Sequence, residues 1–456
     1  MVSSATPQRA SAYGLSTHLL LVDLVWASDI RPLLVKSFPC QTEAVYDRAR
    51  VYAYGGALVQ DAGYYLGGQA DLSDLTHYAR SGDFVSNLFR NATDVDELAF
   101  ALGALTHYVG DTIGHPDATN QSVPIAFPNL GLKYHSSVVT YEKDPKAHLQ
   151  VEFGFDVNAA KLGRLRPPAL MKDEHPDLSL QQLAFAYYQT YGLTDDLTYA
   201  RAGLSARSYY GSTEGLLPFG TYTKANVAAF KPVHGTDEAG LQKLIDDVAS
   251  REDWKSHRKH AGLPRILGAP LVLFVSKTYI RYPTTETQSK YDRSVVASVD
   301  RIREVIASVH ATPGDFVPLW PADKAGDRGQ PLPNFNLDTG EVEEPGVYEK
   351  SGDIHRKWLS RVSDPASKEN RRYAPPQKEP WSVPASAQRN LSTFFADPAK
   401  SQSDPVMTKA QLGKLGTPVT DSCPANNFGW HMVNPEQYFG DPQHSIAGLC
   451  PYITPK

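Results

Sequence analysis

The stretch from Glu97 to Asn120, ELAFALGALTHYVGDTIGHPDATN, decides the fold of this protein. Its apolar residues recur at steps of three and four, which predicts a buried helix. His107, Asp111 and His115 follow one another at intervals of four residues, so they are predicted to lie on one face of this helix, which Pro116 is expected to end. Three ionisable groups on an apolar face are costly to bury unless something binds them, and a metal ion is the usual partner.

The composition excludes several classes of protein. The chain has 456 residues, 41% of them hydrophobic, which is ample for a large core. Its net charge of -5 argues against a protein whose surface coats nucleic acid. An acidic balance does not exclude a metal-dependent nuclease. The longest apolar run, Leu267 to Val275, is far too short for a transmembrane helix.

Two features bear on where the protein works. An A-x-A cleavage signature, Ala10 to Ala12, precedes Tyr13, which suggests that residues 1–12 are a leader or pro-segment and that the protein is secreted or periplasmic. Met1 to Arg9 nevertheless lacks the apolar core of a signal peptide. Cys423 and Cys450 are close enough in sequence to close a disulfide loop, but two free thiols fit the sequence equally well.

The rest of the chain predicts an all-α, multi-helix bundle. Helical periodicity marks the following ranges: Ser16 to Ile30, Thr42 to Asp61, Ala147 to Leu162, Leu178 to Tyr191, Glu238 to Ala249 and Ser294 to Val309. Leu72 to Arg90 is expected to form a short helix and a loop, and Val123 to Pro145 is expected to be a loop. The domain is expected to span residues 13–310, followed by an irregular, Pro-rich extension over 311–456.

Ligand-type residues gather on these segments, and they comprise five histidines and three carboxylates: His18, Asp61, His77, His107, Asp111, His115, His148 and Glu152. Zinc takes imidazole and carboxylate ligands, and a set of this size suits two to three zinc ions. His135 with Glu142 is a rival for the pair His148 and Glu152. The seven-residue gap of the rival pair requires an unbroken helix, which the prolines of its segment disfavour.

Five motifs in this order resemble the zinc-dependent phospholipase C family: Tyr13 to His18 (YGLSTH), Gly56 to Asp61 (GALVQD), Leu75 to Tyr78 (LTHY), His107 to His115 (HYVGDTIGH) and His148 to Glu152 (HLQVE). The resemblance covers roughly residues 13–163 and is closer to the catalytic domain of glycosylphosphatidylinositol-specific phospholipase D and its bacterial relatives. More distant kin are the secreted bacterial phosphatidylcholine phospholipases C and the single-strand nucleases with a trinuclear zinc site. It implies the all-α phospholipase C/P1 nuclease-like fold.

The resemblance also implies a role for each ligand. One zinc is held by Asp61, His77 and His107, and Asp111 bridges it to a second zinc. His18 binds the second zinc together with the terminal amine and carbonyl of Tyr13, after cleavage behind Ala12. The third zinc is held by His115, His148 and Glu152.

The favoured function is that of a zinc-dependent phosphodiesterase acting on phospholipid or lipid-anchor head groups, with a metal-activated water and Asp61 as a catalytic residue. Its partners are then a lipid head group and, transiently, a membrane surface, with nucleic acid an unlikely partner. Two alternatives remain: a single-strand nuclease or nucleotidase that uses the same zinc site, and a non-catalytic binding protein stabilised by metal. Tyr64, Tyr65, Tyr78 and Phe84 could flank a head group, but they are equally consistent with core residues.

Overall fold

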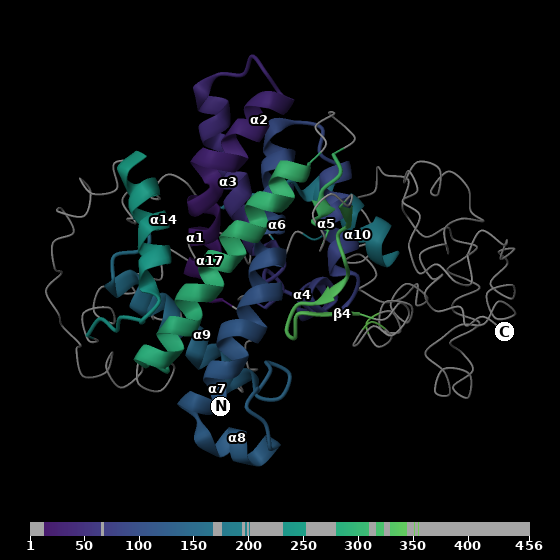
Figure 1. The fold of residues 1–456 in the computed structure, drawn as a ribbon. Helices are drawn as coiled ribbons and strands as arrows, with labels where there is room; N and C mark the ends of the chain where they lie inside the picture. Colours follow the sequence, from purple (N-terminus) through teal and green to yellow (C-terminus); the bar gives the residue numbers. More distant parts are fainter. Residues whose placement is uncertain are drawn as a thin grey trace, which may run out of the picture.

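The computed structural model is mostly helical (Figure 1). It describes residues 13–64, 68–166, 176–193, 197, 200, 231–251, 280–309, 316–322, 329–343, 351 and 354. The helices are α1 (Leu15–Val25), η1 (Trp26–Ile30), α2 (Arg31–Ser37), α3 (Glu43–Val59), α4 (Ala70–Tyr78), α5 (Ser81–Arg90), α6 (Val95–Gly114), η2 (His115–Thr119), α7 (Asn120–Ala126), α8 (Pro128–Tyr134), α9 (Pro145–Lys161), α10 (Leu180–Tyr191), α14 (Glu238–Arg251) and α17 (Thr285–Ser308). The all-α prediction is therefore confirmed.

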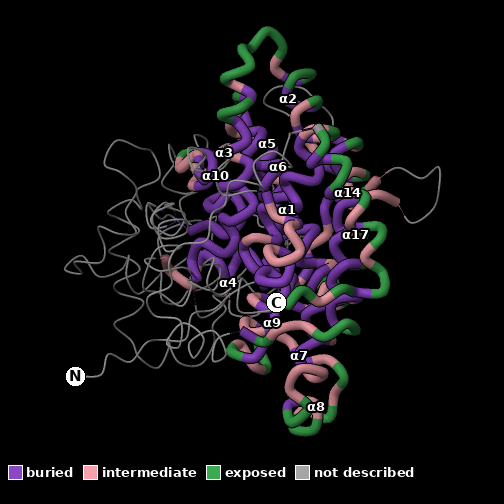
Figure 2. The backbone as a smooth tube through the Cα atoms, turned by 90° about the vertical axis from the view of Figure 1, so that its left-hand side faces the viewer, coloured by how far each residue is buried: buried purple, intermediate pink, exposed green. Residues whose placement is uncertain are grey.

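Helix α6 lies at the centre of the bundle, and α17 crosses over it in Figure 1. Its start is fixed by Asp94, whose side chain accepts a hydrogen bond of 2.8 Å from the backbone N–H of Glu97. Almost every residue of α6 is buried, which explains why the stretch that begins at Glu97 is apolar on nearly all sides of the helix. The tube coloured by burial shows the same concentration of buried residues around α6 (Figure 2).

Two glycines bring α3 and α6 into close contact. A Cβ atom on Gly56 would collide with the backbone carbonyl of Phe100, and one on Gly103 would collide with that of Ala53. Helix α3 runs unbroken through Gly56, so this glycine serves close packing and does not loosen the helix. The close approach holds the end of α3, and therefore the turn that contains Asp61, against α6.

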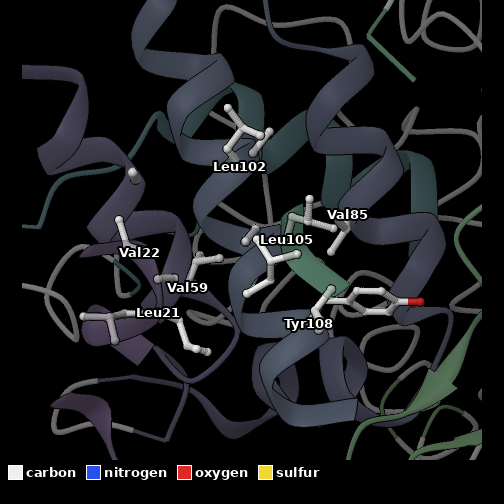
Figure 3. Packing of buried hydrophobic residues seen from close by; sticks show 14 of the residues in the cluster. Leu21, Val22, Val59, Val85, Leu102, Leu105 and Tyr108 are labelled. Carbon is white, nitrogen blue, oxygen red and sulfur yellow. The ribbon is translucent and has the colours of Figure 1, made fainter. Parts of the chain in front are cut away.

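Around α6 the neighbouring helices contribute aliphatic side chains to one core (Figure 3). The labelled residues come from four helices: Leu21 and Val22 of α1, Val59 of α3, Val85 of α5, and Leu102, Leu105 and Tyr108 of α6. Full burial of one such aliphatic side chain contributes about 1.5–3 kcal/mol. This core fixes the relative positions of the helices that carry the ligand-type residues.

Several predicted boundaries were wrong. Leu72 to Arg90 forms two helices, α4 and α5, separated by Arg80 with a φ of 53°. The expected loop from Val123 to Pro145 instead contains most of α7 and all of α8; Pro128 starts α8, where a missing N–H costs nothing. Pro116 does not stop the helical path either, because the chain continues through the π-helical segment η2 into α7.

Residues 329–343, here called the hairpin segment, lie beyond the predicted domain end at 310 but pack against the helices beside α4 (Figure 1). Strand β1 (Leu319–Trp320) pairs with β2 (Gln330–Pro331), and β3 (Phe335–Asn336) pairs with β4 (Glu341–Val342), both antiparallel. The Ser81 hydroxyl donates to the carbonyl of Phe335 at 2.6 Å. The backbone N–H of Leu337 donates to the carbonyl of His77 at 2.9 Å. The hairpin segment therefore borders the helix that carries a predicted ligand.

Among the described residues, no helix is long and apolar enough to cross a membrane. The predicted leader, residues 1–12, and most of 311–456 lie outside the described residues, as do Cys423 and Cys450. Cys40 is an exposed free thiol.

Candidate metal centre

Three helices and one turn bring the first five ligand-type residues together. His18 comes from α1, Asp61 from the turn after α3, His77 from α4, and His107 and Asp111 from α6. All five residues are at most 2% exposed. Two triads have ligand atoms within 4.8 Å of one another, one made of Asp61, His77 and His107 and the other of His18, His107 and Asp111.

The carboxylate of Asp111 lies between these two triads. Its Oδ1 is 3.4 Å from Nε2 of His18. Its Oδ2 is 3.3 Å from Nε2 of His77 and 3.1 Å from Nε2 of His107. The two oxygens thus face different histidines, which is the arrangement that a carboxylate needs to bridge two cations.

Two of these histidines are oriented by backbone carbonyl groups. Nδ1 of His77 lies 2.7 Å from the carbonyl oxygen of Ser73, and Nδ1 of His107 lies 2.8 Å from that of Ala57. A carbonyl oxygen only accepts, so each Nδ1 carries a hydrogen and each Nε2 is the nitrogen that faces the centre. Metal-ligating histidines are usually oriented by this kind of hydrogen bond.

The electrostatics of the cluster favour positive charge at its middle. Burial lowers the pKa of His77, but hydrogen bonds to Asp111 and Asp61 outweigh it and raise this pKa to about 10. Burial also opposes ionisation of Asp61, yet the nearby His107 and His77 outweigh that effect and lower the pKa of Asp61. For His18, by contrast, burial and the neighbouring His107 lower the pKa to about 3. Protons and metal ions therefore compete for the same nitrogen atoms.

A third triad consists of His115, at the start of η2, with His148 and Glu152 of α9. Its ligand atoms again lie within 4.8 Å of one another, and its residues are at most 1% exposed. Oε1 of Glu152 lies 2.9 Å from Nε2 of His148, whereas Oε2 of Glu152 and Nε2 of His115 have no hydrogen-bond partner among the described residues. Burial and the carboxylates of Asp61 and Asp111 raise the pKa of Glu152 well above its usual value.

The residues present fit zinc. Fully buried carboxylates such as Glu152 and Asp111 are costly unless cations lie beside them. Imidazole and carboxylate together form the donor set that zinc takes in catalytic sites. The triads match the predicted grouping of ligands, although His107 lies close enough to take part in either of the first two.

Tyr13 lies next to His18 but directs its side chain elsewhere. Its ring meets the His18 ring edge-on at 5.9 Å, and its hydroxyl donates to Ser294 of α17 at 2.8 Å. A Cβ atom on Gly114 would collide with the Tyr13 ring, so this glycine makes room for it. The predicted metal role of Tyr13 concerns its backbone amine and carbonyl and stays a prediction.

Asp156, one turn after Glu152 on α9, holds the start of α1. It accepts hydrogen bonds from the backbone N–H groups of Ser16 at 2.9 Å and Thr17 at 3.1 Å. Its negative charge also lies at the positive end of the helix dipole. Helix α9 therefore supplies two predicted ligands and also fixes the helix that carries His18.

The rival pair is in none of the three triads. His135 and Glu142 are both exposed, and His135 ends α8 with a φ of 48°. Among the aromatic candidates, Phe84 belongs to the core, where its ring stacks on Tyr191. The rings of Tyr64 and Tyr78 lie 5.6 and 6.3 Å from that of His77 and are nearly buried, while Tyr65 is outside the described residues.

The sequence interpretation missed Asp338 of the hairpin segment. Its Oδ1 lies 3.0 Å from Nδ1 of His115, and the side chain is 2% exposed. Burial opposes its ionisation, but the hydrogen bond with His115 outweighs this and lowers the pKa of Asp338 to about 2. Its sequence context, NLDTG, reads as a turn and carries no spacing typical of a ligand.

Comparison with known proteins adds one match. Residues 17–193 match the family described as zinc dependent phospholipase C. No curated protein and no solved structure matches the chain. The matched residues include every predicted side-chain ligand from His18 to Glu152, whereas Tyr13 and Asp338 lie outside them.

Proposed function

We propose, from the membership of residues 17–193 in the zinc-dependent phospholipase C family, that this protein is a zinc-dependent phosphodiesterase. Its substrates are phospholipid head groups or the head groups of lipid-anchored molecules, as in the phospholipase D-like branch that its motifs resemble. The observation that carries the proposal is Asp111, whose two oxygens face different histidines at 3.1–3.4 Å. A metal site that only stabilises a fold needs no carboxylate that bridges two metal ions.

The three triads support three proposed positions for zinc. Asp61, His77 and His107 form the first, and Asp111 connects it to the second, at His18. His115, His148 and Glu152 form the third. Bound zinc ions supply charge for the phosphate oxygens and lower the pKa of a coordinated water.

Different groups of this protein have different roles in the proposed reaction. Asp61 is ionised at neutral pH, so its carboxylate is able to orient a water molecule and accept a proton from it. The backbone carbonyls of Ser73 and Ala57 hold His77 and His107 in the ligating tautomer. The buried core around α6 keeps these groups in place without substrate, which is the pre-organisation that electrostatic catalysis needs.

We also propose that the protein works outside the cytoplasm and meets a membrane surface only transiently. The A-x-A signature ends at Ala12, and the buried Tyr13 ring lies beside His18, which suits a new amino terminus at Tyr13. A terminal amine has a lone pair for zinc, whereas an amide nitrogen does not.

A substrate panel tests the proposal. Phospholipid vesicles, single-stranded DNA and a small phosphodiester are each incubated with the protein as purified, after treatment with a chelator, and after return of zinc. We expect release of head groups that the chelator abolishes and zinc restores, with the DNA left intact. Cleavage of the DNA alone would assign the same centre to a nuclease, and no hydrolysis by the zinc-loaded protein would leave only a binding role.

A further inference from the structure

Asp338 is a buried carboxylate, 2% exposed, that lies outside the matched residues and yet touches a predicted zinc ligand. Its Oδ1 is 3.0 Å from Nδ1 of His115, and its backbone carbonyl oxygen is 3.2 Å from the same nitrogen. The two residues are separated by 223 positions in the chain. The hairpin segment therefore reaches the third triad directly.

The other contacts of this carboxylate determine which partner donates. Oδ1 of Asp338 accepts from the backbone N–H of Tyr141 at 2.9 Å, and Oδ2 accepts from that of Glu142 at 3.2 Å. A carboxylate surrounded by N–H donors acts as an acceptor, so Nδ1 of His115 carries the hydrogen. Nε2 of His115 is then the nitrogen with the lone pair, and it is the one available to a metal in the triad of His115, His148 and Glu152.

The same aspartate also fixes the surroundings of His148. The Tyr141 ring meets the His148 ring edge-on at 5.6 Å and 89°, and Asp338 holds the backbone of Tyr141. Its position is set in turn by Asn120, which donates from Nδ2 to the Asp338 carbonyl at 2.6 Å, and by Asn336, which accepts from the Asp338 N–H at 3.0 Å. The backbone of Asp338 is thus held at both its N–H and its carbonyl group.

We propose that Asp338 is the positioning residue of the third zinc site, holding His115 in the tautomer and orientation in which Nε2 binds metal. The inference rests on the proposed function, because it takes the triad of His115, His148 and Glu152 as a zinc position. Carboxylate partners of metal-ligating histidines typically change metal affinity by about 10–100-fold when they are removed. The hairpin segment is accordingly part of the metal centre, although it lies in the region expected to be an irregular extension.

The experiment compares four variants of the full chain. Asp338→Ala removes the carboxylate, and Asp338→Asn keeps one oxygen as an acceptor for His115. Ser81→Ala removes hydrogen bonds of 2.6 and 3.0 Å to Phe335, so it loosens the same hairpin segment without touching His115. Glu341→Ala changes an exposed carboxylate on β4 and controls for the loss of charge.

Two readouts separate a positioning role from a merely structural one. The first is zinc content during titration with a competing chelator, followed ion by ion. The second is the ¹⁵N spectrum of the His115 ring in metal-free protein, which reports the tautomer without any metal. We expect Asp338→Ala to weaken one zinc by about 10–100-fold and Asp338→Asn to weaken it less, because the amide keeps an acceptor. Ser81→Ala and Glu341→Ala should hold that zinc like the wild type.

The ring spectrum should show Nδ1–H for His115 in the wild type and lose this preference in Asp338→Ala. An unchanged spectrum would overturn the inference, as would equal weakening of zinc in Asp338→Ala and Ser81→Ala. A wild-type protein that never holds a third zinc, but shows the expected tautomer change, would overturn the trinuclear part of the proposed function and not the pairing of Asp338 with His115.

Discussion

Replacing Asp111 by asparagine should remove two zinc ions at once, whereas replacing Glu152 by glutamine should remove only one. The Asp111 oxygens contact His18 on one side and His77 and His107 on the other, at 3.1–3.4 Å. Glu152 belongs to the third triad only. Both substitutions keep the size of a fully buried side chain and remove its charge, so they form a matched pair.

The magnitude follows from the number of positions lost. A site that binds only the folded state stabilises it by about 2.7 kcal/mol when free zinc is about 100 times its Kd. Asp111→Asn should therefore lose about 5 kcal/mol of zinc-dependent stabilisation and Glu152→Gln about 2.7 kcal/mol. With an unfolding entropy of about 2.1 cal/mol/K per residue, a domain of about 300 residues shifts by about 1.6 °C per kcal/mol, so the zinc-dependent shift in Tm should fall by about 8 °C in the first variant and about 4 °C in the second.

The assay is thermal unfolding of each variant with zinc and with chelator, together with elemental analysis. Taking the difference between the two conditions cancels the effect of each substitution on the metal-free fold. Zinc content should fall by two ions in Asp111→Asn and by one in Glu152→Gln. The same zinc loss in both variants, or a wild-type zinc content in Asp111→Asn, would refute the bridging role.

Other outcomes follow from the same geometry. His135→Ala should leave zinc content and activity unchanged, since this exposed side chain comes just after the last residue of α8. Loss of a zinc ion in this variant would instead show that His135 is a ligand. Burial lowers the pKa of His18 and His148 to about 3, so these two side chains bind more protons in the unfolded chain than in the folded protein between about pH 6.5 and about pH 3. Their contribution to stability, measured by denaturant titration, should therefore fall as the pH drops through this window. A stability that rose on acidification would contradict this. A form that begins at Tyr13 should bind zinc at His18 more tightly than the chain that begins at Met1, as chelator titration would show, and equal affinities would argue against the amine ligand.

Much of the fold followed from the sequence because helical periodicity is a local property. The i, i+4 pairs His107/Asp111 and His148/Glu152 each lie on one helix, as predicted. Boundaries at proline were less predictable. Pro116 lacks the N–H for an α-helical hydrogen bond, but the chain closes wider turns there, and the N–H of Asn120 donates to the carbonyl of His115. The helical path therefore continues where the sequence predicted an end.

The sequence by itself determined that the protein is helical and which eight side chains are candidates for metal binding. Both follow from residue type and from spacing within each helical segment, which are local properties. Residue type and spacing alone left open how these side chains group; the family resemblance implied the grouping, and the tertiary structure brings the side chains together. Packing of α3 against α6 through Gly56 and Gly103 brings Asp61 to the centre, and Asp111 lies between the histidines of different helices. Asp338 shows most clearly what sequence patterns cannot predict. Its partner His115 is 223 residues away, and no local pattern in a Pro- and Gly-rich region encodes a contact over that separation.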